Sequence, residues 1–228
     1  FSRNGFALAS LVPNDLDAII HFAWDGVGSK GRENPEIQAQ NLLMSKGFYQ
    51  WGLQTGVKYF LFAGSQAEYG RGTRENPEPV SAYGKAKLSF SRYGLSGGRA
   101  VEDSAFPKQC FRSFEDKEET EQEKAKETEQ KAVQKAEQKA EQKAVQKAEQ
   151  KAEQEKPMKF LDLRIFSVYG VGDHETTLVH TLVQEVLAGR PMDLSPCSQM
   201  WNFMEARDLA RAIAFLLEGG FGSGTYDL

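Results

Sequence analysis

The chain has few of the residues that bind metals or form disulfides. Its 228 residues include two cysteines and three histidines. Cys110 and Cys197 lack C-x-x-C spacing, and His21, His174 and His180 lack the spacing of metal ligands. We therefore expect no metal site, and we interpret both cysteines as reduced thiols of a cytoplasmic protein.

The sequence also lacks a strong charge excess and a long apolar run. Its formal net charge is −4, and no basic face with interleaved aromatic residues appears, which argues against nucleic-acid binding. No apolar run reaches the length of a membrane-spanning helix, and the first residues, FSRNGFALAS, show no clear signal-peptide pattern. What is present is a 40% hydrophobic chain, which is sufficient for one sizeable core away from membranes.

One segment combines a buried-type strand with polar residues at a suggestive spacing. The apolar run Tyr59–Ala63 is typical of a buried strand and ends at Gly64-Ser65. Tyr83 follows, with Lys87 four residues later. On a helix, a spacing of four places the phenol and the ammonium on one face.

These three residue types form a chemically coherent set. A free phenol has a pKa of about 10, and a nearby ammonium lowers that pKa by favouring the phenolate. A serine hydroxyl can hold a substrate oxygen in line. Such a set can take a proton from an alcohol as its carbon gives up a hydride, or run the reverse. The alternative is an unremarkable tyrosine and lysine on the surface of an ordinary helix.

The motif GSQAEYG followed by SAYGKAK resembles the active-site segment of the extended short-chain dehydrogenase/reductase family, which comprises NAD-dependent nucleotide-sugar epimerases, dehydratases and reductases. Further segments fit in the same order: HFAW at 21–24, Asn41, LRIFSVYG at 163–170 and QMWNFMEARDLARA at 199–212. The resemblance implies an α/β fold with a Rossmann-like doubly wound parallel sheet. We expect that sheet to be truncated and to carry a small substrate-binding lobe and a low-complexity charged insertion.

The resemblance also implies roles for individual residues. Tyr83 would be the acid/base, Lys87 would lower its pKa and hold the ribose, and Ser65 would hold the reacting oxygen. The cofactor would be NAD or NADP, the substrate a nucleotide sugar, and a homodimer the assembly. The implied cofactor-side residues are Phe22, Ala23, Trp24, Asn41, Tyr83, Lys87, Phe166 and Val168, and the implied substrate-side residues are Gln66, Ser167, Gln199 and Trp201. Trp24 stands where the family has a small residue.

The beginning of the chain predicts a partial sheet. Residues 17–23 are typical of a buried strand, and the following Gly26–Gly31 matches G-x-G-x-x-G. Asn34-Pro35 interrupts the helix that a dinucleotide fingerprint requires, so we interpret this match as a flexible loop beside the cofactor and substrate cleft. The family's N-terminal glycine-rich unit has no counterpart, and we expect the C-terminal GSGTYDL to lie inside a further strand.

Several other elements follow from local patterns. We predict a helix over Pro35–Thr55, a core strand over 158–165, a short strand over 199–204 and a helix with Asp208 near its start. The glycine-rich YGLSGG after Lys87 predicts that the helix there does not continue cleanly. A stripe of apolar residues at helical spacing predicts core packing: Leu178, Val179, Leu182, Val183, Val186 and Leu187.

A charged repeat interrupts the chain. From about Phe114 the sequence becomes rich in Glu, Lys, Gln and Ala, and KAVQKAEQKAEQ occurs at 131–142 and again at 143–154. Its period of four places like charges one turn apart, and it has no sustained coiled-coil seam, which indicates a solvated helix or disorder. We therefore divide the chain into a partial dinucleotide-binding region over 1–113 that carries the Ser/Tyr/Lys site, an insertion over 114–157, and a remaining strand with a partial substrate lobe over 158–228.

The sequence leaves three functional hypotheses. The first is an NAD(P)-dependent nucleotide-sugar epimerase, dehydratase or reductase that transfers a hydride, with Tyr83 as acid/base. The second is a non-catalytic remnant that cannot bind the cofactor, because the glycine-rich cofactor loop has no counterpart. The third is an interaction protein that uses the charged repeat.

Overall fold

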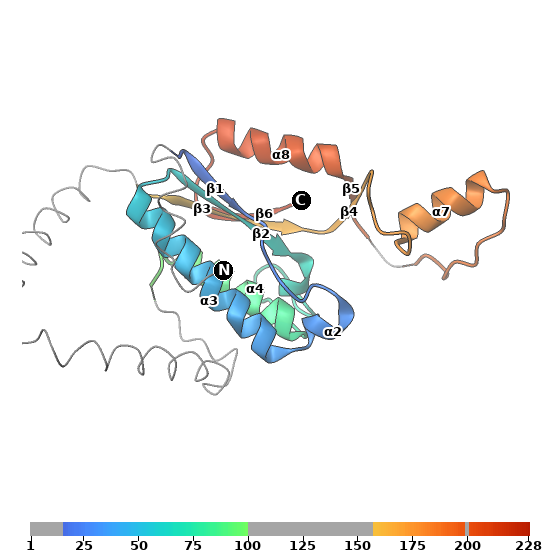
Figure 1. Cartoon of the computed structure of the whole chain (residues 1–228), viewed down its shortest axis with the longest axis horizontal. Helices are drawn as coiled ribbons and strands as arrows, with labels where there is room; N and C mark the ends of the chain where they lie inside the picture. Colours follow the sequence, from blue (N-terminus) through green and yellow to red (C-terminus); the bar gives the residue numbers. More distant parts are fainter. Residues whose placement is uncertain (1–15, 100–156, 199–200) are drawn as a thin grey trace, which may run out of the picture.

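The computed structural model describes residues 16–99, 157–198 and 201–228 of the chain (Figure 1). Its centre is a four-stranded sheet in the order β1-β2-β3-β6, in which every neighbouring pair is parallel. The strands are β1 (Ala18–His21), β2 (Tyr59–Ser65), β3 (Lys159–Ile165) and β6 (Gly224–Asp227). Helices α3 and α4 cover one face and α8 covers the other, which confirms the predicted α/β architecture.

The two faces of the sheet have different cores because strand side chains alternate. Phe60 and Phe62 of β2 and Phe160 of β3 point toward α3 and α4, where they pack with Tyr49 and Phe90. The opposite face is aliphatic and packs against α8, with buried residues Leu61, Leu161, Leu163, Leu209, Ile213 and Leu216. Burial on both faces explains the nearly continuous apolar run of β2.

Local signals fix the bounds of α3 (Pro35–Thr55), as predicted. The Asn34 side chain accepts hydrogen bonds from the backbone N–H groups of Glu36 and Ile37, and proline occupies the first helical position. The helix ends at Gly56, which adopts a left-handed conformation with φ of 72°. The short helix α2 (Ser29–Arg32) precedes it and occupies the loop after β1.

Helix α4 (Ala82–Leu95) carries Tyr83 and Lys87 and extends further than predicted. Its last two turns bury Phe90 and Tyr93, and Gly94 packs so closely on Phe160 that a Cβ would collide with that ring. The glycine that we interpreted as a helix breaker is therefore a close-packing position. The 3-10 helix η1 (Gln66–Glu68) links β2 to the loop that leads into α4.

The C-terminal part adds a second, smaller sheet. Strands β4 (Ser167–Tyr169) and β5 (Phe203–Glu205) pair in parallel, and α8 (Ala206–Glu218) follows β5 directly. The short strand predicted over 199–204 thus lies slightly later, and the strand predicted near the C-terminus is confirmed as β6.

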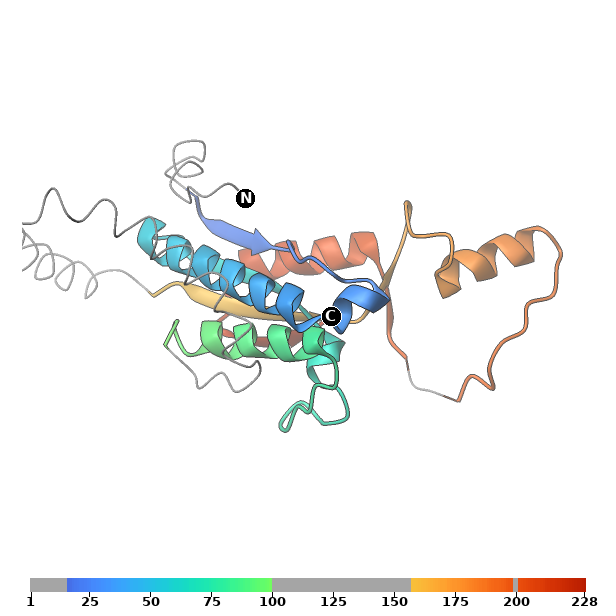
Figure 2. The same cartoon turned by 60° about the horizontal axis from the view of Figure 1, so that its bottom comes forward.

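Helix α7 (Leu178–Leu187) corrects the prediction of a core stripe. Figures 1 and 2 show it standing away from the main sheet, and none of its residues is buried in the described part of the chain. Val186 and Leu187 are 67% and 77% exposed. A stripe at helical spacing shows which face can be buried, and here no described segment covers that face.

Two groups of predictions fall outside the described residues. The charged repeat lies within 100–156, and Gln199 lies in the gap at 199–200. Among the described helices, none has the length and apolar character needed to cross a membrane.

Candidate active site

Ser65 is the last residue of β2, where the strand turns into η1. Its backbone N–H donates to Glu68 Oε1 at 2.8 Å, and its Oγ accepts from the backbone N–H of Ala67 at 3.2 Å. This reciprocal capping box fixes the serine at the carboxyl edge of the sheet. Gly64 precedes it because a Cβ there would collide with the carboxylates of Asp162 and Glu68.

Tyr83 lies in the first turn of α4 and is 8% exposed. The turn is fixed by Ser81, whose Oγ accepts from the backbone N–H of Gly84 at 3.0 Å. Burial raises the pKa of Tyr83 above its ordinary value, while a side-chain hydrogen bond with Ser65 and the charge of Arg32 lower it in part. The structure thus brings Ser65 and Tyr83 together, with the tyrosine favoured as the neutral phenol.

Lys87 lies one turn further along α4 and is 3% exposed. Its Nζ donates to the backbone oxygen of Ala63 and lies among three aromatic rings, 4.3 Å from the centroid of Trp24, 4.7 Å from Phe62 and 5.4 Å from Tyr83. Burial lowers the pKa of Lys87 to about 8, against the opposing effect of the carboxylates of Glu68 and Asp162. That the lysine lowers the pKa of Tyr83 stays a prediction.

Near Ser65, Tyr83 and Lys87 lies a buried cluster of charges, which we call the acid–arginine cluster. It is formed by Glu68, Asp162 and Arg164. Arg164 Nε lies 3.2 Å from Glu68 Oε2 and 3.2 Å from Asp162 Oδ2. Ser91 Oγ also donates to Asp162 Oδ2, at 2.7 Å. Burial raises the pKa of both carboxyl groups, and the arginine opposes that effect.

Sequence reasoning missed this cluster, although a signal for it was present. Asp162 and Arg164 are two residues apart in the strand, between apolar neighbours, so they share one face of β3. Charged residues are almost never fully buried unless they are paired. That rule predicts a buried partner, and Glu68 is that partner.

The loop after β1 is held against α3 by buried amide side chains. Gln38 Oε1 accepts from Trp24 Nε1 at 2.8 Å, and Gln38 Nε2 donates to the backbone oxygen of Gly31 at 2.9 Å. Asn41 accepts from the backbone N–H of Asp25 and donates to its carbonyl oxygen, at 3.0 and 2.9 Å. The Gly26–Gly31 segment, which we predicted to be a flexible loop, is therefore hydrogen-bonded to α3, and its flexibility stays a prediction.

The predicted cofactor-side residues on this loop lie in different environments. Phe22 and Ala23 are exposed, and Phe22 is 51% exposed. Trp24 is half-buried and contacts the Tyr83 ring edge-on, with centroids 6.2 Å apart. Asn41 is buried, and its amide is engaged with Asp25 as described above.

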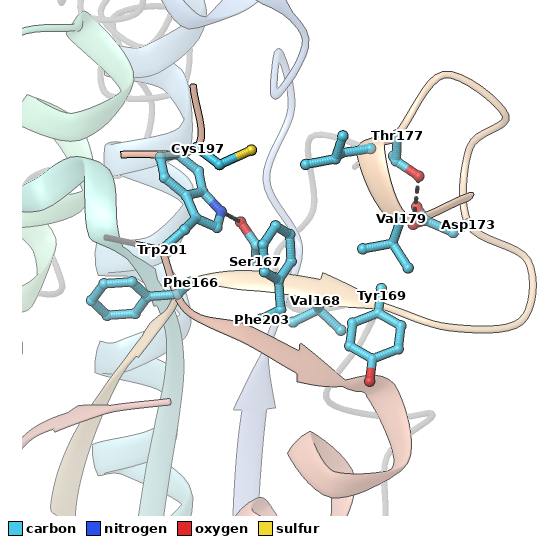
Figure 3. Close-up of a pocket in the computed structure, with 11 residues that line it drawn as sticks. Phe166, Ser167, Val168, Tyr169, Asp173, Thr177, Val179, Cys197, Trp201 and Phe203 are labelled. Carbon is cyan, nitrogen blue, oxygen red and sulfur yellow. Dashed lines mark hydrogen bonds between the residues drawn. The ribbon is translucent and has the colours of Figure 1, made fainter. Parts of the chain in front are cut away.

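A second group of predicted residues lines a cavity of about 650 Å³ between β4, β5 and α7 (Figure 3). Phe166, Ser167, Val168 and Trp201 belong to this lining, which is mainly apolar. Trp201 Nε1 donates to Ser167 Oγ at 2.7 Å. Gln66 lies half-buried on η1, outside the cavity lining.

The two groups meet at one edge of the main sheet. Ser65 pairs with Ile165, and Phe166 follows Ile165 directly, so the serine and the cavity both lie beyond the carboxyl ends of neighbouring parallel strands. Tyr69 and Phe166 contact each other, with ring centroids 6.4 Å apart. Ligands of open parallel sheets bind in this position.

Comparison with known proteins gives a consistent family and fold. Residues 3–114 and 103–227 match the NAD dependent epimerase/dehydratase family. No curated protein matches the chain. Among solved structures, UDP-N-acetylglucosamine 4-epimerase from Bacillus cereus has a TM-score of 0.59 and 16% identity, with 94% of this chain and 58% of that chain covered.

Two further structures extend this comparison. MoeE5 in complex with UDP-glucuronic acid and NAD has a TM-score of 0.58 and 21% identity, and the match covers 99% of this chain and 59% of that one. A double mutant of DesIV, a dTDP-glucose 4,6-dehydratase from Streptomyces venezuelae, with NAD bound, has a TM-score of 0.54 and 16% identity. That match covers 92% of this chain and 51% of that one. The chain thus spans between 51% and 59% of the length of these three structures, and the likeness concerns the fold.

Proposed function

Because the chain belongs to the NAD dependent epimerase/dehydratase family, we propose that it carries the proton-transfer site of an oxidoreductase that acts on a nucleotide sugar with NAD or NADP. The observation that carries this proposal is the convergence of Ser65, Tyr83 and Lys87 at the carboxyl edge of a parallel sheet. Their side chains come from a strand end and from two positions of one helix, as the chemistry requires.

The donor set at this edge fits the nicotinamide end of a dinucleotide. Two hydroxyl groups and an ammonium are grouped beside Trp24, which follows the exposed Phe22 and Ala23 in the chain, and Tyr83 and Lys87 would hold the ribose. The described residues offer no matching pyrophosphate site, because Gly26 packs directly on Gly31 and the helix at this position, α2 (Ser29–Arg32), has only four residues. When bound, NAD(P) supplies the hydride acceptor or donor.

The chain's own residues would hold and move the proton. The Tyr83 hydroxyl would donate its proton to a substrate carbonyl oxygen or, as phenolate, take one from a substrate hydroxyl. Ser65 would hold the same oxygen. Because burial raises the pKa of Tyr83, the phenol dominates at neutral pH, which favours donation and places proton removal at higher pH.

The cavity beside β4 suits the nucleotide part of the substrate. Phe203 and Trp201 supply aromatic surface for a base, and Ser167 supplies a hydroxyl, while Phe166 and Val168 in the same lining remain the proposed cofactor-side residues. The proposed contacts of Gln66 and Gln199, the division of the chain at 113 and 157, and a homodimer remain predictions of the same proposal. UDP-glucose, UDP-glucuronic acid and dTDP-glucose, taken from the names of the structural neighbours, form a first substrate panel.

One observation favours the non-catalytic alternative. The Lys87 ammonium is engaged with Ala63 and covered by Trp24, so a ribose reaches it only if the indole moves. Titration of the chain with NADH and NADPH, followed by nicotinamide fluorescence, separates the two readings. Saturable binding supports the enzyme, and no saturation by a folded chain supports the non-catalytic protein. Deleting 114–157 leaves the binding unchanged if the repeat is an appendage.

A further inference from the structure

Arg32 makes a contact with Tyr83 that no sequence motif indicated. It is the last residue of α2, and its guanidinium carbon lies 4.4 Å from the centroid of the Tyr83 ring. The arginine is half-buried rather than free on the surface. At this distance a guanidinium is attracted electrostatically to the aromatic ring.

The loop that carries Arg32 is held in place. The backbone N–H of Arg32 donates to the carbonyl oxygen of Gly28 at 2.9 Å, and the buried Gln38 binds the carbonyl oxygen of Gly31. Gly31 packs against Gly26 so tightly that a Cβ would collide with its backbone. The G-x-G-x-x-G match in the sequence thus serves to fold this loop back over α4.

We propose that Arg32 is a positioning residue for Tyr83: the arginine supplies the permanent positive charge beside the phenol, while Lys87 is engaged with Ala63. The inference deepens the proposed function, on which it rests only for the role of Tyr83 as acid/base. Among the residues that the structure describes, the charged groups that face the Tyr83 ring or its hydroxyl are Arg32 from α2, Lys87 from α4 and Glu68 from η1.

The order of proton loss supports the division of roles. Lys87 has a pKa of about 8, whereas burial raises that of Tyr83 above its ordinary value of about 10. Lys87 therefore becomes neutral before Tyr83 ionises. An arginine stays protonated throughout this range, so Arg32 is the cation that still stabilises the phenolate when it forms.

The test is a spectrophotometric titration of tyrosine ionisation. Each protein is compared with its own Tyr83→Phe partner, so that the difference isolates Tyr83 from the other six tyrosines. We expect Arg32→Gln to move the Tyr83 midpoint to higher pH and Arg32→Lys to move it less. Lys30→Gln removes a charge from the same short helix at an exposed position and is the matched control, with an unchanged midpoint.

Lys87→Met supplies the comparison between the two cations. The proposal expects it to move the Tyr83 midpoint less than Arg32→Gln does, and circular dichroism checks that each variant is folded. An unchanged midpoint in Arg32→Gln, or a larger shift in Lys87→Met, would overturn the proposal. Because the titration uses neither cofactor nor substrate, its outcome is separate from that of the dinucleotide titration.

Discussion

The Trp24 indole lies over the Lys87 ammonium, with Nζ 4.3 Å from the ring centroid. The hydrogen bond from Trp24 to Gln38 and the edge-on contact with Tyr83 hold the indole there. As a result Lys87 is almost fully shielded from solvent, although it lies at the carboxyl edge of the sheet. The large indole thus lies between the lysine and the solvent.

This relationship predicts the reactivity of Lys87. With a pKa of about 8, a substantial fraction of the amine is neutral at pH 8, yet an acylating reagent should not modify it while Trp24 covers it. Trp24→Ala should make Lys87 one of the modified lysines, as measured by peptide mass spectrometry. Trp201→Ala, which changes the cavity beside β4, is the control and should leave Lys87 unmodified. Modification of Lys87 to the same extent in the wild-type protein as in Trp24→Ala would contradict the shielding.

The buried His21 should titrate far below an ordinary histidine. Burial and the Lys87 charge lower its pKa to about 4. Ser45 Oγ donates to Asn41, so the 2.8 Å contact between His21 and Ser45 is a donation from Nε2–H of the neutral ring. In an NMR titration, one histidine signal should have its midpoint at about 4 and be missing from His21→Gln. A midpoint near 6.5 for that signal would contradict the burial.

The same depressed pKa has a consequence for stability. The unfolded chain takes up a proton at His21 as the pH falls below about 6.5, while the folded chain does not until about 4. As the pH falls through this range, His21 should therefore reduce the free energy of unfolding by up to about 1.4 kcal/mol for each pH unit. The raised pKa values of Glu68 and Asp162 act in the opposite direction, so the measurement is the difference between the wild-type protein and His21→Gln.

The acid–arginine cluster should be sensitive to the loss of one partner. Arg164→Met leaves two carboxyl groups buried without their cation, and we expect the free energy of unfolding to fall by about 3–5 kcal/mol. Arg211→Met is the control, because its pair with Asp208 is exposed and should change stability by less than about 1 kcal/mol. Urea denaturation measures both. A loss in Arg164→Met no larger than in the control would show that the cluster is not an energetic unit.

Two helical glycines should respond to alanine in opposite directions. Gly94→Ala places a methyl group against the Phe160 ring and should destabilise the protein by about 1–3 kcal/mol. Among the described residues nothing lies within 4 Å of a Cβ at Gly47 in α3, so Gly47→Ala should stabilise by about 0.5–1 kcal/mol. Thermal unfolding of the two variants provides the comparison, and shifts of the same sign would contradict it.

Much of the fold could be predicted from short stretches of the sequence. The predicted bounds of α3, Pro35–Thr55, match the structure, in which the signals that fix them are local: the cap at Asn34, Pro35 and the terminal Gly56. The strand β2 followed from the apolar run Tyr59–Ala63, β3 matches the strand predicted over 158–165, and the shared face of Tyr83 and Lys87 followed from helical geometry. Each of these signals acts over a few residues, which is why they could be recognised in the sequence.

The features that were missed depend on contacts between distant segments. Gly94 was interpreted as a breaker because its partner, Phe160, is distant in sequence. The contact of Arg32 with Tyr83 depends on how the loop after β1 folds back, which no local pattern records. The exposed apolar face of α7 shows the converse, since its periodicity describes a surface but not what lies over it.

The most direct test of the central claim is turnover of the nucleotide-sugar panel by the wild-type chain and by Tyr83→Phe, in the presence of NAD or NADP. We expect the wild-type chain to convert at least one sugar, and Tyr83→Phe to lower kcat by about 10²–10⁴-fold while it still binds NADH. Equal turnover by the two proteins would show that Tyr83 does not transfer the proton. No turnover and no dinucleotide binding by the folded wild-type chain would contradict the enzymatic account itself.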